Sequence, residues 1–511
     1  MMIKSFACAL DGIEAQLITI EINVNRGAKI YMVGLPDNAI KESHQRMAAA
    51  LKNVGYKLPI KEITINLAPA DIKKEGSAYD LTIAIGVLAA TNQLAETKSI
   101  PDYIIMGELA LDGNLRPIKG VLPIAMYAKK AGFKGIILPI ENQNEAALVK
   151  GLDVLGAINI KDVIKHFNNE KLILAHKYIP KQEEDALLNN IDFSDVKGQE
   201  NVKRALEIAA AGGHNIILIG PPGSGKSMLA KRMATILPPM TMSEAMDTTK
   251  IYSISGLLTN NFGLVNKRPF RSPHHTVSNV ALVGGGSNPK PGEISLAHNG
   301  ILFLDELPEF KRSVLEVLRQ PLEDREVTIS RALKTVDFPA GFMLVAAMNP
   351  SPNGDFYNPN DPLADSKNNI QRYLSKLSGP LMDRIDLQIE VLPVTYDELS
   401  EKQSSESSSE VRKRVIDARK NQQNRYAKYK GVYCNAQLST KQMNNHCILD
   451  KKGDKILRHA IEKLNLSARS YARIKKVSRT IADLDKSDKI LSKHIAEAVQ
   501  YRSLDRMTKF N

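Results

Sequence analysis

A glycine-rich stretch between an apolar run and a helix-like segment constrains this chain more than any other feature. Residues 220–227 read Gly-Pro-Pro-Gly-Ser-Gly-Lys-Ser, which fits the pattern G-x-x-x-x-G-K-[ST]. They follow the apolar run 216–219 and precede a helix-like segment over 228–237. A strand, a glycine-rich turn and a helix in this order wrap main-chain N–H groups around phosphate oxygens. The stretch therefore predicts a P-loop inside an α/β domain.

Each position of this loop has an expected role in binding a nucleoside triphosphate. Lys226 is expected to reach the β and γ phosphates, and the Ser227 hydroxyl to bind Mg²⁺. A glycine-rich turn that binds nothing is the alternative, and the strand, the Lys-Ser pair and the helix together argue against it. The predicted nucleotide-binding residues are Gly220, Pro221, Pro222, Gly223, Ser224, Gly225, Lys226 and Ser227.

A second apolar run, residues 301–304, ends in the acids Asp305 and Glu306. Behind a P-loop, this arrangement predicts that Asp305 approaches the Mg²⁺ held by Ser227 and that Glu306 orients or deprotonates the attacking water. Acids after a strand can also serve as helix caps, but the P-loop upstream favours the catalytic interpretation. Lys226, Asp305 and Glu306 are thus candidate catalytic residues of an ATPase with ATP and Mg²⁺ as its ligands.

The rest of the composition sets limits on the class of protein. A chain of 511 residues is expected to form roughly three or four domains. The longest apolar stretch, residues 81–90, is half of what a membrane span needs, so we expect a cytoplasmic protein without a membrane segment. Cys434, His446 and Cys447 lack a fourth metal ligand, which favours ordinary packing over a metal site.

The positive charge of the chain is concentrated at one end. Residues 401–511 hold 26 Lys and Arg against 12 Asp and Glu, whereas the whole chain has a net charge of +13. The first 400 residues are therefore close to neutral. A one-sided excess of this size favours a nucleic acid partner over a merely solvated surface. Within it, Arg412, Lys413 and Arg414 begin a predicted basic helix over 412–430 and are candidate DNA contacts.

The interval between Lys226 and Asp305 leaves room for an insertion. His274 and His275 fall inside it, and no acid or cysteine is spaced to complete a metal site with them. Further on, residues 326–330 and 335–338 alternate like the strands of a hairpin. Arg331 and Lys334 lie at its tip, where two cations would suit a phosphate backbone, so they are also candidate DNA contacts.

The N-terminal region contains a stretch, residues 107–118, that resembles the Lon protease domain. Lon-type enzymes use a Ser and a Lys as a catalytic dyad. At the corresponding positions this chain has Ala78 and Leu122, with Ser77 as a neighbour that permits another alignment. The resemblance therefore implies a Lon protease-like fold, of the ribosomal S5 domain 2 type, without protease activity.

Residues 377–387 and 466–474 resemble signatures of the magnesium chelatase-like AAA+ ATPases, in particular the ComM (YifB) group. The resemblance implies an AAA+ P-loop α/β core with helix-2 and pre-sensor 1 insertions and a helical C-terminal lid. It assigns Asn349 as sensor 1, Arg384 as the arginine finger that enters a neighbouring subunit, and Arg469 as sensor 2. Arg473 competes with Arg469 for the sensor 2 role. In this group the insertion containing the two histidines is expected to face the pore of a ring.

The resulting domain organisation has five parts. We expect a Lon-like domain over 1–165, a linker over 166–191, an AAA+ core over 192–395, a flexible joint over 396–411 and a basic helical lid over 412–511. Many relatives have a cysteine-rich stretch after sensor 1 that this chain lacks, so no zinc is expected.

The resemblance implies a hexameric motor that moves on branched or single-stranded DNA and drives branch migration of recombination intermediates, as in natural transformation. Two alternatives stay open at this point. An ATP-dependent unfoldase or protease would suit the Lon-like domain, and a magnesium chelatase-type motor subunit would suit the ATPase family.

Overall fold

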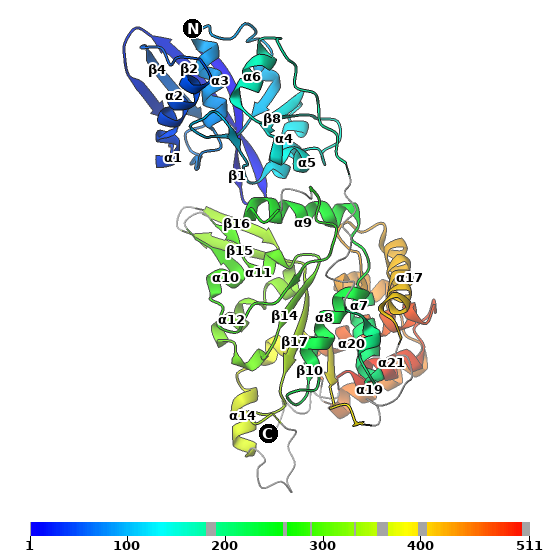
Figure 1. Ribbon diagram of the computed structural model, residues 1–511. Helices are drawn as coiled ribbons and strands as arrows, with labels where there is room; N and C mark the ends of the chain where they lie inside the picture. Colours follow the sequence, from blue (N-terminus) through cyan, green and yellow to red (C-terminus); the bar gives the residue numbers. More distant parts are fainter. Residues whose placement is uncertain are drawn as a thin grey trace. The chain divides into compact units, whose positions relative to one another are not determined.

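The computed structural model describes residues 2–179, 191–258, 263–286, 289–331, 334–354, 366–396, 406–464 and 466–502. The chain forms two compact units, one made of Met1–Gln182 with Met242–Val265, and the other of Glu183–Thr241 with Asn266–Asn511. Figure 1 labels their elements. Among the described residues, no helix is both long and apolar enough to cross a membrane.

The first unit is built on a seven-stranded mixed sheet in the order β3-β4-β2-β1-β5-β8-β9. The long pair β1 and β2 and the pair β2 and β4 run antiparallel, and the other neighbours run parallel. The strand bounds are β1 Met2–Asp11, β2 Glu14–Asn25, β3 Ile30–Val33, β4 Glu62–Ala68, β5 Tyr103–Ile105, β8 Gly135–Pro139 and β9 Asp153–Ala157.

The helices of this unit pack on the sheet through apolar faces. The helix α3 (Asp80–Ala90) is buried at every position, which explains why its sequence is almost entirely apolar. The remaining elements are α1 Asn38–Lys41, α2 Ser43–Asn53, β6 Glu108–Leu109, β7 Leu115–Arg116, α4 Val121–Lys130, α5 Gln143–Ala146 and α6 Ile160–Phe167.

One further helix of the first unit comes from the middle of the ATPase sequence. The helix α9 (Met242–Ser255) packs on α4, and Met246 contacts the apolar core of this unit. The main-chain N–H of Gly120 donates to the carbonyl of Ser253 at 3.1 Å. Part of the insertion predicted between the P-loop and Asp305 therefore folds with the Lon-like region.

The second unit contains a five-stranded, wholly parallel sheet in the order β11-β14-β17-β10-β18. Helices cover both faces, so β10, β14 and β17 are completely buried, which explains their continuous apolar runs. The bounds are β10 Ile216–Ile219, β11 Phe270–Arg271, β14 Ile301–Leu304, β17 Met343–Met348 and β18 Leu387–Glu390.

The P-loop lies between β10 and the helix α8 (Lys226–Ile236), with α7 (Glu200–Gly212) ahead of them. Antiparallel β15 and β16 form the predicted hairpin, whose residues 332 and 333 lie outside the described residues. Other elements of this region are α10 Asn279–Val283, β12 Gly284–Gly285, β13 Lys290–Pro291, α11 Glu293–Leu296, α12 Arg312–Val317, α13 Pro321–Asp324, β15 Glu326–Arg331, β16 Lys334–Pro339, α14 Lys367–Leu374 and α15 Gly379–Met382.

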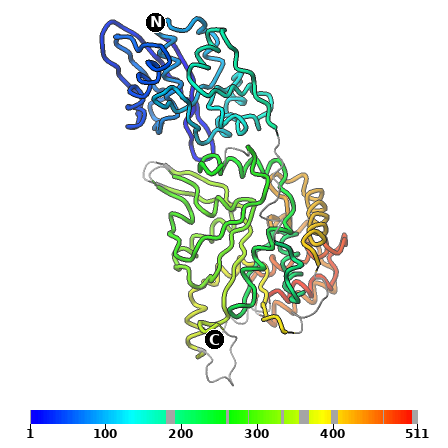
Figure 2. Tube along the Cα trace, in the orientation of Figure 1, coloured from blue at the N-terminus to red at the C-terminus, as the bar shows by residue number. Residues whose placement is uncertain are grey.

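Among the described residues, five helices follow the sheet; two of them pack on α7 or α8, and the other three pack on those two or on one another, as can be followed in Figure 2. The first begins at Ser408, four residues before the predicted start, because Ser407 and Glu410 form a capping box. Their bounds are α17 Ser408–Tyr426, α18 Thr440–His446, α19 Lys451–Leu464, α20 Ala468–Leu484 and α21 Ser492–Gln500.

Candidate active site

The P-loop keeps its glycines for steric reasons that the structure makes explicit. A Cβ on Gly220 would lie 2.1 Å from the carbonyl oxygen of Val391, so no larger residue fits there. Gly225, at the start of α8, has φ +89°, a conformation that favours glycine. The loop therefore turns tightly from the buried strand β10 into the N-terminus of α8, where free N–H groups suit an anion.

Lys226 is held by its own loop and by the end of a neighbouring strand. Its ammonium donates to the carbonyls of Gly220 and Pro221 at 2.7 and 2.8 Å, and Nζ lies 3.2 Å from Oδ1 of Asn349. Burial lowers the pKa of Lys226, an effect that nearby Asp305 and Glu306 oppose. The structure thus brings the predicted P-loop lysine and the predicted sensor residue into contact.

Ser227 and Asp305 form the expected pair. The Ser227 hydroxyl donates to Oδ2 of Asp305 at 2.6 Å, although 78 residues separate them in the sequence. β14 and β10 are separated by β17 in the sheet, and parallel strands bring all three carboxyl ends to the same edge. Mg²⁺ prefers oxygen ligands such as a hydroxyl and a carboxylate. The Ser227–Asp305 pair therefore fits the Mg²⁺ ion that a P-loop ATPase implies.

Glu306 has an unusual backbone conformation. Its φ is +52°, which non-glycine residues adopt rarely and which is enriched at functional sites. The side chain is exposed, and Oε2 lies 3.4 Å from Nδ1 of His275, whose ring stacks on His274. The sequence suggested a pore-facing loop for these histidines and did not predict the contact with Glu306.

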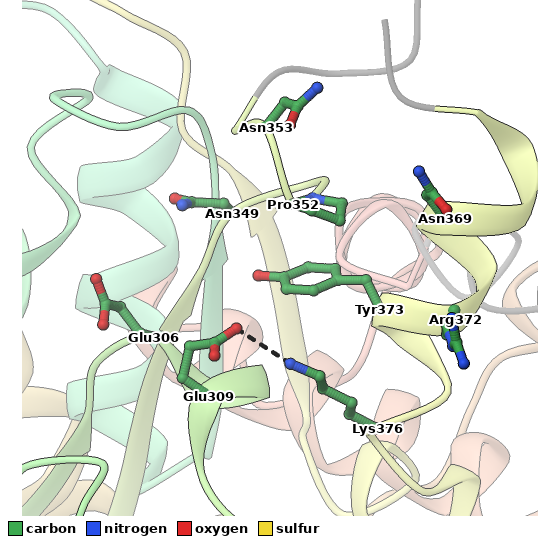
Figure 3. A pocket seen from close by; sticks show the side chains of 9 residues that line it. All are labelled: Glu306, Glu309, Asn349, Pro352, Asn353, Asn369, Arg372, Tyr373 and Lys376. Carbon is green, nitrogen blue, oxygen red and sulfur yellow. Dashed lines mark hydrogen bonds and ion pairs between the residues drawn. The ribbon is translucent and has the colours of Figure 1, made fainter.

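Glu306 and Asn349 open into a common cavity of about 570 Å³ (Figure 3). Its far wall is the helix α14, which the sequence had not linked to the site. Among the lining side chains, Lys376 pairs with Glu309 at 3.2 Å. The other lining residues are Pro352, Asn353, Asn369, Arg372 and Tyr373. No sequence pattern distinguished them, because α14 reaches the site only through the packing of the second unit.

Arg384 lies at the opposite end of the sheet from the P-loop of its own chain. Its carbonyl accepts from Nδ2 of Asn215 at 3.0 Å, and Asn215 precedes β10 whereas the P-loop follows it. A four-residue strand spans about 13 Å. The Arg384 side chain is buried, donates to the carbonyl of Pro380 at 2.7 Å and forms an ion pair with Glu323.

The two candidate sensor 2 arginines differ in their surroundings. Arg473 donates to Oδ1 of the buried Asp386 at 2.9 Å. Burial alone would raise the pKa of Asp386, but Arg473 and His214 hold it below its ordinary value. Arg469, one turn earlier on α20, is exposed. Arg473 thus has a structural partner, and Arg469 is the better candidate for contact with a ligand.

The positions that resemble the Lon dyad lie in the first unit and contain no such dyad. Leu122 is fully buried, and its main-chain N–H donates to Oε1 of Glu145 at 2.7 Å. Ser77, next to Ala78, donates its hydroxyl to Glu108. Glu145 also accepts from the Ser253 hydroxyl of α9, so the Leu122 position contributes to the α9 contact.

The candidate DNA contacts are only partly accessible. Arg414 forms ion pairs with Glu207 and Glu406, whereas Lys413 is exposed and Arg412 half-buried. Arg331 is the last residue of β15 and Lys334 the first of β16, and their side chains lie outside the described residues. Tyr426, which lies among these basic residues, is wholly buried and donates to Oδ1 of Asn435 at 2.7 Å, so its ring is not available to stack on a base.

Three family models match the chain in succession. They are "Subunit ChlI of Mg-chelatase" over residues 20–142, "Magnesium chelatase, subunit ChlI" over 192–399, and "Magnesium chelatase, subunit ChlI C-terminal" over 405–502. The middle match contains the P-loop, Asp305, Asn349 and Arg384.

Curated relatives match almost the full length. Competence protein ComM of Haemophilus influenzae is 46% identical over 505 residues, covering 97% of this chain and 96% of that protein. The uncharacterized protein YifB of Escherichia coli is 44% identical over 503 residues, with the same coverage. Lon protease 2 of Bacillus subtilis is 31% identical over 121 residues, which cover 24% of this chain and 21% of the protease. With an α/β P-loop unit and relatives along its whole length, this chain belongs to the magnesium chelatase-like AAA+ ATPases of the ComM/YifB group.

Proposed function

We propose that the chain hydrolyses ATP and uses the energy to move along DNA, promoting branch migration of recombination intermediates as part of a ring, expected to be a hexamer. The observation that carries the hydrolytic part is the cluster at the carboxyl edge of the parallel sheet. There Ser227 bonds to Asp305, and Lys226 contacts Asn349, beside the exposed acid Glu306.

In this proposal each residue of the cluster has one task. Main-chain N–H groups of 220–227 and the Lys226 ammonium bind the phosphates, and Lys226 exchanges its carbonyl partners for phosphate oxygens. Ser227 and Asp305 would hold Mg²⁺, which would supply positive charge to neutralise the phosphates. Glu306 orients the attacking water and accepts its proton, and Asn349 hydrogen-bonds the water or the γ phosphate.

The position of Arg384 supports a site shared between subunits. Because Asn215 and the P-loop are at opposite ends of β10, the Arg384 of one chain does not reach the nucleotide of the same chain without a large rearrangement. Arg469 shares this end, since Ser467 lies 3.4 Å from Asp383 and Arg473 binds Asp386. Both arginines are therefore proposed to act on the nucleotide of a neighbouring subunit, which requires an oligomer.

DNA as the partner is supported by two observations. One relative at 46% identity is named a competence protein. In addition, the helices after residue 406 expose lysines, among them Lys413, Lys420, Lys428 and Lys430 of α17 and the residues after it. Phosphate contacts by such side chains bind DNA without reading its sequence.

Two alternatives make different predictions. The similarity to Lon protease 2 favours an ATP-dependent protease or unfoldase, but the dyad positions hold Ala78 and Leu122. The matching family models are named for a magnesium chelatase subunit, which favours a chelatase-type motor. Neither alternative accounts for the positive charge of the last fifth of the chain.

The experiment that tests the proposal measures ATP hydrolysis by the purified chain alone and with four-way junction, single-stranded and duplex DNA. We expect hydrolysis in all cases, with stimulation by at least one DNA. Hydrolysis that no DNA stimulates would contradict the proposed movement along DNA and leave the proposed ATPase activity standing. Peptide cleavage that persists in a Lys226→Ala variant would instead support the protease alternative.

A further inference from the structure

Tyr373 is the most buried polar side chain in the wall that faces the proposed catalytic residues. It belongs to α14, where Ile370 and Tyr373 are buried one turn apart and Arg372 is exposed, as is Lys376 just after the helix. Figure 3 shows the Tyr373 ring crossing the cavity, with its hydroxyl pointing toward Asn349 and Glu306. The hydroxyl is thus directed at the reaction centre from the helix opposite.

The phenol oxygen has a defined neighbour. The hydroxyl faces Asn349, the residue directly after β17, and the Asn349 main chain opposes the effect of burial on the pKa of Tyr373 (Figure 3). The Asn349 side chain in turn reaches Lys226, with Oδ1 3.2 Å from Nζ. A continuous line of contacts therefore runs from α14 through the Asn349 main chain to the P-loop lysine.

The ring is fixed from its other face. The Lys376 ammonium lies 5.6 Å from the ring centroid, and the same ammonium is 3.2 Å from Oε1 of Glu309. An ammonium group over the face of an aromatic ring is attracted to that ring. The ion pair with Glu309 in turn limits the movement of the Lys376 ammonium. The phenol is therefore restrained by its own helix and by Lys376, with its hydroxyl facing Asn349.

The protonation state of this phenol is suited to a hydrogen-bond donor. Burial raises the pKa of Tyr373 to about 12, and Glu309 and Glu306 act in the same direction. The hydroxyl thus keeps its proton at any neutral or mildly basic pH. The protonated hydroxyl can therefore donate to a group in the cavity that Tyr373 and Glu306 both line.

We propose that Tyr373 is a positioning residue of the ATPase site, which holds Asn349 in register with Lys226 and helps to order water in the cavity beside Glu306. The proposal rests on the ATPase function proposed above. It predicts that loss of the hydroxyl impairs turnover more than nucleotide binding, because the sensor residue is misplaced while the P-loop stays intact.

The test is a steady-state comparison of Tyr373→Phe with the full-length parent. We expect kcat to fall about five- to tenfold, as for loss of one well-placed hydrogen bond, with KM for ATP changed less than about twofold. The matched control is Tyr429→Phe, which removes a hydroxyl bonded to His446 at 3.2 Å in the C-terminal helices. It should leave kcat unchanged.

A double-mutant cycle separates positioning from general damage. If Tyr373 acts through Asn349, adding Tyr373→Phe to Asn349→Ala should lower kcat no further. Full multiplication of the two losses, or a kcat for Tyr373→Phe equal to that of the parent, would overturn the inference while leaving the ATPase function intact. A parent chain that does not hydrolyse ATP would instead remove the proposed function.

Discussion

Glu306 shows at the scale of one residue how backbone conformation and chemistry coincide. Its left-handed φ of +52° turns the chain directly after β14, so that Asp305 faces Ser227 while Glu306 faces the cavity and His275. Two adjacent acids therefore have different environments. This difference permits one to serve a metal and the other to serve the attacking water.

Glu306→Gln should retain ATP binding and lose turnover by about 100-fold or more, since the amide cannot accept the proton of the water. Binding is measured with a fluorescent nucleotide, and turnover by phosphate release. Glu309→Gln is the matched control. Glu309 lines the same cavity and pairs with Lys376 beside Tyr373, so a smaller loss of turnover is expected there than for Glu306→Gln. Equal turnover in Glu306→Gln and the parent would remove Glu306 from the catalytic role.

Glu145 is a second residue with a consequence that can be measured. Burial raises its pKa to about 7, although the Ser253 hydroxyl and the Leu122 N–H oppose the shift. The folded state thus binds the proton more tightly than the unfolded state, with its ordinary pKa of about 4.5. The stabilisation is complete below the unfolded value and is lost as the pH rises toward 7.

Glu145→Gln keeps a carbonyl acceptor for Leu122 and removes the charge. We expect the free energy of unfolding of the variant, relative to the parent, to rise between pH 5 and pH 8 by up to about 3 kcal/mol. Urea unfolding at several pH values measures it, with Glu141→Gln, an exposed neighbour, as the control. A difference that does not depend on pH would show that Glu145 is ionised in the folded protein throughout.

At the scale of the element, α17 has both a structural and an exposed side. Arg414 pairs with Glu207, Arg419 donates to the carbonyls of Ala210 and Ala211, and Arg425 pairs with Asp483. Several arginines of the predicted basic helix thus attach it to the rest of the second unit. The exposed lysines are available to bind DNA phosphates. Among them, Lys413 and Lys420 are seven residues apart and lie on one face of the helix.

Reversing Lys413 and Lys420 to Glu should weaken DNA binding and reduce the slope of log affinity against log salt by about two. Fluorescence anisotropy at several salt concentrations measures both. The control is the double variant Lys52→Glu and Lys57→Glu, which makes the same change in net charge at exposed positions of the first unit. If both pairs weaken binding equally, the effect comes from net charge and α17 is not the contact.

The helix α9 shows that sequence order and structural membership differ. It follows the P-loop helix in the ATPase sequence, yet it belongs to the first unit, where Ser253 contacts Gly120 and Glu145. The chain thus leaves the second unit at residue 241 and returns at 266. The position that would be the catalytic lysine in a Lon-type enzyme, Leu122, lies beside this contact.

At the scale of the whole molecule, we expect that the proposed active site needs a second chain to be complete. Arg384 is buried against Glu323 at one end of β10, and the P-loop is at the other. Arg384→Ala and Lys226→Ala should each abolish hydrolysis, whereas a 1:1 mixture should regain it at about one interface in four. Hydrolysis is measured after the variants are mixed and reassembled.

The control for this experiment is a mixture of Lys226→Ala with Glu306→Gln, two lesions in the same half of the site, which should not regain activity. Failure of the first mixture, although its two variants assemble together, would contradict action of Arg384 between subunits. Recovery of hydrolysis in the control mixture would show that mixing subunits restores activity without completing a shared site, so the first result would not support action of Arg384 between subunits.

Local sequence was sufficient for the P-loop, for the acids after β14 and for the buried parallel strands. Each is encoded by residues within a few positions of one another, and the apolar runs were continuous because both faces of the sheet are covered. The hairpin of β15 and β16 was predictable from alternation for the same reason. The basic helix predicted over 412–430 is observed as α17 over Ser408–Tyr426, and the capping box sets its start.

Tertiary structure alone decided which distant residues meet. The contacts of Tyr373 with Asn349, of Ser253 with Glu145 and of Asn215 with Arg384 join positions 24 to 169 residues apart. No local periodicity encodes them, because they depend on how helices and sheet edges pack. The P-loop could therefore be predicted from the sequence. The position of α14 opposite it, the packing of α9 in the first unit and the separation of Arg384 from its own P-loop could not.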